Sequence, residues 1–169
     1  YNEKDKAVAA PVGYLPQKTV SGRQMPVGTL GNASDMVADS EGQLYIVDTD
    51  NGCIVVLDEE LAYQTTLTFK ENGADTPLPG LAGLFIQGNG EERRYYAADP
   101  ENQRVIVADS GLHIQQVITR PDSALLPENV LFAPDKVLVD EQGTIFVLLP
   151  GLYRGACVFS PQGEFLTFF

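Results

Sequence analysis

Short apolar runs alternate with polar turns along the whole chain. The runs 44–47, 53–57 and 105–108 are continuously apolar, as expected of strands buried on both faces. No segment keeps apolar residues at helical spacing for three turns, and β-branched residues crowd the apolar runs. The pattern therefore predicts an all-β protein. Three further runs mix polar and apolar positions, as strands with an exposed face do: 63–69, 113–118 and 164–169.

These runs recur at a fixed spacing. The segment 45–58 aligns without a gap with 96–109, so that Asp48 meets Asp99 at an offset of 51 residues (99 − 48). A weaker third copy places Asp39 against Asp140, an offset of 101 (140 − 39), or about two periods. Each copy has room for four short strands, and four antiparallel strands repeating every 40–50 residues are typical of β-propeller blades. A β-sandwich, the main alternative fold, does not explain an ungapped repeat.

The repeat predicts about three blades, which is part of a ring. Residues 1–13 are expected to form an N-terminal arm, and 14–20 a strand that has no blade of its own. The remainder of the domain 14–169 divides into the three predicted blades, at about 33–69, 81–120 and 134–169.

The first copy resembles the NHL repeat, through its core GQLYIVDTDNGCIVVLD. The second copy keeps Asp99, Asn102 and Arg104, whereas the third keeps Asp140 and Gly143 but lacks the Asp and Asn of the second turn. The resemblance implies a propeller that, when complete, usually has six blades. Members of this family serve as ligand-binding platforms or scaffolds, and some relatives are enzymes. The chain is also similar to the start of bacterial extracytoplasmic NHL proteins, which implies an extracytoplasmic or cell-surface location.

Three blades leave a six-bladed ring half complete. Because the third copy has its own outer strand at 164–169, the strand predicted at 14–20 would pair with a blade beyond residue 169. We therefore expect further sequence to complete the ring. The alternative is that two copies of this chain join, three blades plus three.

The segment Asp48-Thr49-Asp50-Asn51-Gly52 can be interpreted as a metal loop or as an acidic hairpin turn. A calcium EF loop requires glycine at its sixth position, whereas Gly52 falls at the fifth, and an apolar strand follows at once. Asp and Asn side chains accept hydrogen bonds from nearby backbone N–H groups, and glycine tolerates positive φ. The turn interpretation is therefore favoured.

The other single residues have structural interpretations too. Arg104 is expected to bridge neighbouring strands or blades through Asp or Asn, with a ligand-facing role as the alternative. Cys53 and Cys157 lie two blades apart, beyond disulfide reach, and are expected to be free thiols. His113, the only histidine, is expected to be exposed, and the sequence therefore supports no catalytic triad.

Four residues are candidates for ligand binding. Tyr153 and Arg154 lie in the loop 150–155, which departs most from the repeat, and suit sugars or peptides. Asp35 and Asp135 are expected to occupy like positions at the starts of inner strands, near the ring axis. Lactonases with related propellers hold a metal there with side chains from several blades, so the resemblance makes a metal-dependent hydrolase the alternative function. The favoured function is a non-enzymatic binding or scaffold module without catalytic residues, metal or cofactor.

The charge balance narrows the class of partner. The net charge of −12 argues against nucleic acids and against anionic lipid, since both would be repelled. No run of about 18 apolar residues is present, so no membrane insertion is expected within this stretch. A protein, carbohydrate or small-molecule ligand remains as the expected partner.

Overall fold

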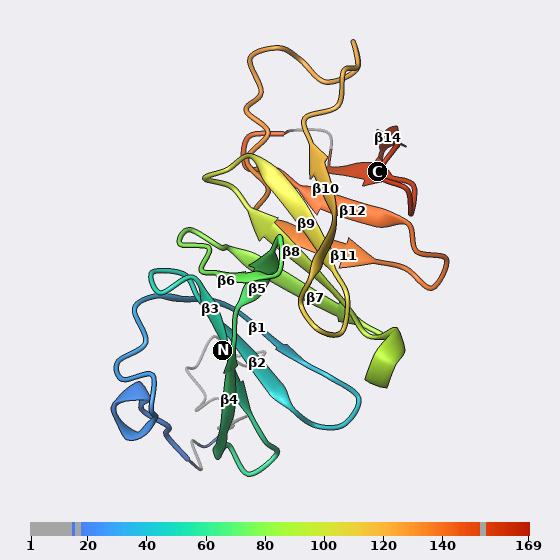
Figure 1. The fold of residues 1–169 in the computed structure, drawn as a ribbon. Coiled ribbons are helices and arrows are strands. Elements are labelled where there is room, and N and C mark those ends of the chain that lie inside the picture. Colours follow the sequence, from blue (N-terminus) through green and yellow to red (C-terminus); the bar gives the residue numbers. More distant parts are fainter. Residues whose placement is uncertain (1–14, 16–17, 153–154) are drawn as a thin grey trace, which may run out of the picture.

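The computed structural model describes residues 15, 18–152 and 155–169. Its strands form three four-stranded antiparallel sheets, which are three blades of a β-propeller (Figure 1). In each blade the strands follow one another from the inner to the outer edge, as the repeat predicted. Blade 1 comprises β1 (Ala33–Ala38), β2 (Leu44–Asp48), β3 (Cys53–Leu57) and β4 (Tyr63–Leu67). Blade 2 comprises β7 (Gly83–Gln87), β8 (Arg94–Asp99), β9 (Arg104–Ala108) and β10 (Ile114–Thr119). Blade 3 comprises β11 (Lys136–Val139), β12 (Ile145–Leu148), β13 (Ala156–Phe159) and β14 (Phe165–Phe168).

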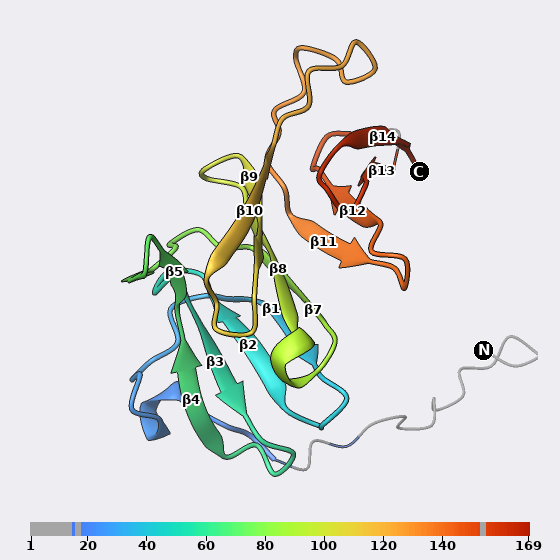
Figure 2. The same cartoon turned by 45° about the vertical axis from the view of Figure 1, so that its right-hand side comes forward.

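The three inner strands lie beside one another, with β7 between β1 and β11 (Figure 2). The outer strands β4, β10 and β14 form the opposite edges of the three sheets. Because a strand alternates its side chains, each blade has a rear face toward the preceding blade and a forward face toward the next. Tyr45 and Val47 of blade 1 face forward and pack in one core cluster with Tyr95 and Ile106 of blade 2. A second cluster joins the forward face of blade 2 to the rear face of blade 3. The continuously apolar runs are therefore the middle strands, covered on both sides.

The chain that enters a blade packs against the rear face of that blade. Leu126 and Phe132, between blades 2 and 3, belong to the second core cluster. Met25 and Leu30, ahead of blade 1, pack in the same way against Val55 of its rear face. The segment 20–30 thus behaves as a connection between blades does.

Two local features differ from the sequence interpretation. Phe69 does not extend β4; it begins a separate hairpin of β5 (Phe69–Glu71) and β6 (Ala74–Thr76), whose Asn72-Gly73 turn is a strong hairpin signal. Of the strand predicted at 14–20, the structure describes 15 and 18–20, and these are not in a strand. The predicted arm 1–13 lies outside the described residues. The helices of the described part are two 3-10 turns of three residues each, and none could span a membrane.

Candidate functional site

The acidic segment of blade 1 is a hairpin turn. β2 pairs with β3, and the side chain of Asp48 between them is fully buried. Its carboxylate accepts the N–H groups of Gly31 at 3.1 Å and Asn51 at 3.4 Å, and the Asn51 side-chain amide at 2.8 Å. These donors satisfy the buried carboxylate, as burial of a charge requires. The hairpin prediction is confirmed.

The same turn in blade 2 shows what Arg104 does. Asp99 is fully buried and accepts the Asn102 side-chain amide at 3.0 Å and Arg104 Nε at 2.8 Å. Arg104 Nη1 also lies 3.9 Å from the carboxylate of Glu71 in β5. The predicted bridging role is confirmed, because this guanidinium joins the turn to the hairpin that precedes the blade.

The turns at the opposite ends of the blades use one repeated device. A side-chain oxygen accepts backbone N–H groups two and four residues further along, which closes the turn. Burial would raise the pKa of Asp140, but hydrogen bonds from the backbone and side chain of Thr144 and the backbone of Gln142 hold that pKa below its usual value. These acids therefore have a structural role in the turns. The residues that accept in this way are Asp39, Asp58, Asp109, Asp140 and Ser160.

Residues at or near the starts of the inner strands lie closest to the ring axis. Asp35 pairs with Val47, Gly83 with Ala98 and Lys136 with Leu148. Since Val47, Ala98 and Leu148 are equivalent in the three blades, Asp35, Gly83 and Lys136 are equivalent too. The expectation that Asp35 and Asp135 share a position is therefore wrong by one residue. Asp135 lies just before β11 and is exposed, and a lysine takes the place expected for the second acid.

Lys136 ties the three blades together at this axis. Its Nζ donates to the backbone oxygens of Ser34 at 3.2 Å and Ala82 at 3.0 Å, and lies 3.3 Å from Asp35 Oδ2. Asp35 Oδ2 in turn accepts the N–H of Leu84 at 3.0 Å. Two carbonyls and a carboxylate around one cation are the oxygen ligands that hard metal ions prefer. Here the ammonium of this chain occupies that position.

Gly83 makes this arrangement possible. A Cβ at this residue would lie 2.5 Å from the backbone oxygen of Asp135 and 3.3 Å from Cδ of Lys136. The missing side chain lets β7 and β11 approach closely and lets the lysine stem cross toward blade 1. Glycine is therefore required here by packing.

The remaining ligand candidates belong to the β12–β13 connection, which the structure describes only in part. The β12–β13 connection is on this side, with Leu149–Leu152 and Gly155 described, whereas Tyr153 and Arg154 lie outside the described residues. We call this side, where the chain enters the inner strands and the second strands turn into the third, the loop face. The role of all four candidates remains a prediction.

A second inter-blade tie lies at the opposite side. Arg93, just before β8, donates to Tyr45 Oη, 2.6 Å away, and to Asp39 Oδ2 at 3.0 Å, and also pairs with Glu41 at 3.2 Å. The side chains of Arg93 and Asp39 are 12% and 3% exposed, so water screens this pair poorly. Burial raises the pKa of Tyr45, and the neighbouring Tyr95 and the hydrogen bond to Asp39 add to the rise.

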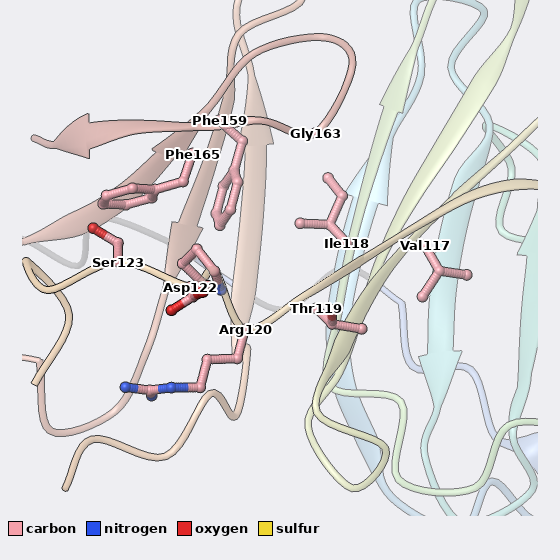
Figure 3. A pocket seen from close by; sticks show the side chains of 10 residues that line it. Val117, Ile118, Thr119, Arg120, Asp122, Ser123, Phe159, Gly163 and Phe165 are labelled. Atoms are coloured by element: carbon pink, nitrogen blue, oxygen red, sulfur yellow. The ribbon is translucent and has the colours of Figure 1, made fainter. Parts of the chain in front are cut away.

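An outer crevice of about 440 Å³ separates blades 2 and 3. Phe159 and Phe165 lie on one side and the β10 residues Ile118 and Thr119 on the other (Figure 3). Arg120 extends away from the two rings and donates to the carbonyls of Leu126, Pro127 and Val130. Its guanidinium therefore organises the connection 120–135.

The thiols and the histidine behave as expected. Cys53 and Cys157 are free, and Cys157 is fully buried. The His113 side chain is 50% exposed, and its Nδ1 lies 3.3 Å from Asp109. Among the described residues, no three His, Cys, Asp or Glu side chains are grouped as metal ligands.

Sequence reasoning missed Lys136 and Arg93. Both act across blade boundaries, on groups more than 40 residues away in the chain. The repeat gave no signal for either, because each is present in a single blade. Only the strand register, which aligns Lys136 with Asp35, could have suggested an opposite charge at the axis.

Comparison with known proteins supports the fold. No family model and no curated protein matches the chain. Among solved structures, hydrazine synthase of Kuenenia stuttgartiensis superposes with a TM-score of 0.56 at 14% identity, over 92% of this chain and 38% of that one. A virginiamycin B lyase from Staphylococcus aureus superposes with a TM-score of 0.53 at 9% identity, over 85% of this chain and 42% of the lyase chain.

A third structure is from Bacteroides fragilis and is described only as a candidate exported protein. It superposes with a TM-score of 0.55 at 16% identity, over 83% of this chain and 38% of that one. The chain thus spans about two fifths of the length of each of these three proteins. At such low identity the similarity concerns the fold alone. The fold is a β-propeller, of which this chain supplies three blades.

Proposed function

We propose that this chain is part of an NHL-like propeller that works as a non-enzymatic binding or scaffold module. Its ligand, a protein, carbohydrate or small molecule, would lie on the loop face, where connections from several blades meet. Neither a nucleic acid nor a membrane is proposed as partner, because the net charge is −12. Further blades on the same ring would complete the module.

One observation carries this proposal. At the axis, where a propeller enzyme of the alternative class would hold its metal, the ammonium of Lys136 already neutralises Asp35 and satisfies two backbone carbonyls. A divalent ion bound through Asp35 would have to displace that ammonium or lie against it. The position favours a rigid platform over a metal-dependent hydrolase.

The other acidic residues also favour a non-enzymatic role, because they have structural roles in turns. Asp48 and Asp99 are buried in turns, and the acids of the opposite turns accept backbone N–H groups. In the loop that departs most from the repeat, 150–155, the described residues 150–152 and 155 are on the loop face, and the sequence has Tyr153 and Arg154 between them. Tyrosine and arginine are frequent among residues that dominate binding energy. The proposed binding set comprises these two residues together with Asp35 and Asp135.

An extracytoplasmic location is part of the proposal. It rests on the resemblance to extracytoplasmic NHL proteins, and the similar Bacteroides fragilis structure, described as a candidate exported protein, agrees with it. Proteolysis of source cells whose outer envelope has been opened while the cytoplasmic membrane stays intact tests the location: digestion before that membrane is lysed supports it, and protection until lysis contradicts it.

The function is tested by probing the chain against arrays of oligosaccharides and peptides and titrating every hit by calorimetry. We expect Tyr153→Ala and Arg154→Ala to weaken a genuine hit by about tenfold or more each, as for residues central to an interface. His113→Ala, on the opposite side, is the matched control and should leave affinity unchanged. Divalent-ion-dependent hydrolysis of lactones, lost in Asp35→Asn, would instead establish the alternative.

A further inference from the structure

The forward face of blade 3 is apolar, and several of its large side chains are exposed although Ala156 and Val158 on the same face are buried. Leu138, Leu148 and Phe169 are 54%, 41% and 84% exposed. Phe146 lies among them, with its ring 5.8 Å from that of Phe169 in an edge-to-face contact. An exposed apolar surface of this kind marks an interaction site. We call these four residues the open face.

Three positions of the open face have counterparts in the other blades that are buried or packed against the next blade. By strand register, Leu138 corresponds to Val37, Phe146 to Tyr45 and Leu148 to Val47. In blade 1, Tyr45 and Val47 are 1% and 0% exposed, because blade 2 covers them. The blade 2 counterparts, Phe85, Tyr96 and Ala98, lie on the side that faces blade 3, and Tyr96 is 5% exposed. The open face therefore continues an interface that the molecule already uses twice.

An acidic residue at the turn end of this interface predicts that the partner carries a positive charge there. Asp39 of blade 1 accepts two backbone N–H groups with Oδ1 and pairs through Oδ2 with Arg93 of the following blade. Asp140 is its counterpart in blade 3 and likewise accepts the N–H groups of Gln142 and Thr144 with Oδ1. In the part of the chain that the structure describes, no Lys or Arg pairs with Asp140.

We propose that the open face is the docking site of a further four-stranded blade, which carries an arginine or lysine at the position of Arg93 and pairs it with Asp140. This inference rests on the proposed function, in which the three blades belong to a larger ring. It adds the chemistry of the partner: apolar side chains opposite Leu138 and Leu148, and one cation at the turn end.

Charge argues against a second copy of this chain as the occupant. Blade 1 of another copy would present Gly42 at the position of Arg93, by the repeat offset of 51 (93 − 42). Asp140 would then receive no cation, while Glu41 would come close to it. Like charges at an interface discriminate against the wrong partner.

The test uses blade 2 as the probe, because it carries Arg93 and already docks on the equivalent face of blade 1. A second copy of residues 68–119 is appended after Phe169. The register makes Phe169 the counterpart of Leu67, so the natural spacing is kept. We expect the amides of the appended blade to be protected from hydrogen exchange, and those of β11 and β12 to exchange about tenfold more slowly than in the parent chain.

Two variants separate the apolar and the charged contributions. Leu138→Lys should abolish protection of the appended blade, whereas Val117→Lys, at an exposed apolar position of β10, should not. Arg93→Gln, made only in the appended copy, should speed amide exchange in the appended blade. Adding Asp140→Asn to that variant should not speed exchange further, because both changes remove the same ion pair. Equal exchange in the Arg93→Gln variant and its parent would overturn the charged part of the proposal.

Other outcomes overturn the proposal entirely. One is an appended blade that stays unprotected although the parent blades remain folded. Another is a stable dimer of the 169-residue chain by light scattering that Leu138→Lys converts to monomers, since a second copy would then be the occupant. Neither result depends on ligand binding at Tyr153 or Arg154, so a failure here is distinguishable from a failure of the proposed binding function.

Discussion

At the scale of single residues, many acidic side chains of this protein accept hydrogen bonds from backbone N–H groups in turns. Asp48 and Asp99 are both fully buried, and each has the N–H donors that a carboxylate inside a protein requires. The motif that resembles a metal loop in the sequence is therefore a hydrogen-bonded turn. A direct consequence is that the loop should stabilise the fold without any ion.

Replacing Asp48 tests this. Asp48→Ala leaves the N–H of Gly31 and the amide of Asn51 without their acceptor, so the free energy of unfolding should fall by about 1–3 kcal/mol. Asp50→Ala, at an exposed position of the same turn, should change it by less than about 0.5 kcal/mol. Urea unfolding with and without calcium measures both. Calcium-dependent stability that both substitutions remove would show a metal site.

The buried thiol of Cys157 predicts a pH dependence. Burial raises the pKa of Cys157 from 9.0 to about 11, and Arg120 acts weakly in the opposite direction. Because the folded pKa is the higher one, the thiol's contribution to stability is complete below pH 9 and is lost as pH rises through about 11. Stability should therefore fall less steeply between pH 9 and 11 in Cys157→Ala than in the parent. Parallel stability curves in chemical denaturation would contradict the prediction.

At the scale of elements, the sequence predicted the strands well where apolar runs and turns agreed. The ungapped repeat placed the middle strands of blades 1 and 2, because burial on both faces leaves a continuous apolar pattern. It missed β5 and β6, which are three residues each and partly exposed, although Asn72-Gly73 was a usable signal. It also placed an acid where Lys136 stands, because alignment by sequence could not fix the strand register at the start of β11.

The axial lysine gives the prediction at this scale. Lys136→Met keeps the stem that crosses Gly83 but removes the ammonium, so the carbonyls of Ser34 and Ala82 lose their donor. Since the side chain is 34% exposed, water replaces part of these contacts, and we expect a loss of about 1 kcal/mol in the free energy of unfolding.

Lys70→Met, a lysine without a carboxylate partner among the described residues, is the control for loss of a positive charge. Thermal unfolding of both variants at two salt concentrations separates the local tie from the general charge effect. Equal losses in the two variants would show that Lys136 acts only through net charge.

At the scale of the whole molecule, the three blades are not equivalent. Blade 2 is covered on both faces, blade 1 is covered by blade 2 and partly by the segment 20–30, and blade 3 has an open forward face. In a repeat protein each unit contributes its own stability and that of its contacts with neighbours. The number of covered faces should therefore order the blades by local stability. The sequence could predict three similar blades, but not this order, because it depends on which faces are covered in space.

Native-state hydrogen exchange measures that order. Amides of the middle strands should exchange most slowly in β8 and β9, faster in β2 and β3, and fastest in β12 and β13. A leucine or phenylalanine side chain that stays exposed forgoes about 1.5–3 kcal/mol of burial energy, which is enough to separate the blades by more than tenfold in exchange rate. Uniform exchange across the three blades would mean that they unfold as one unit and that the exposed open face does not lower the local stability of blade 3. The predicted gradient would instead place the least stable part of the molecule at the open face, where docking of the proposed further blade would add the most stability.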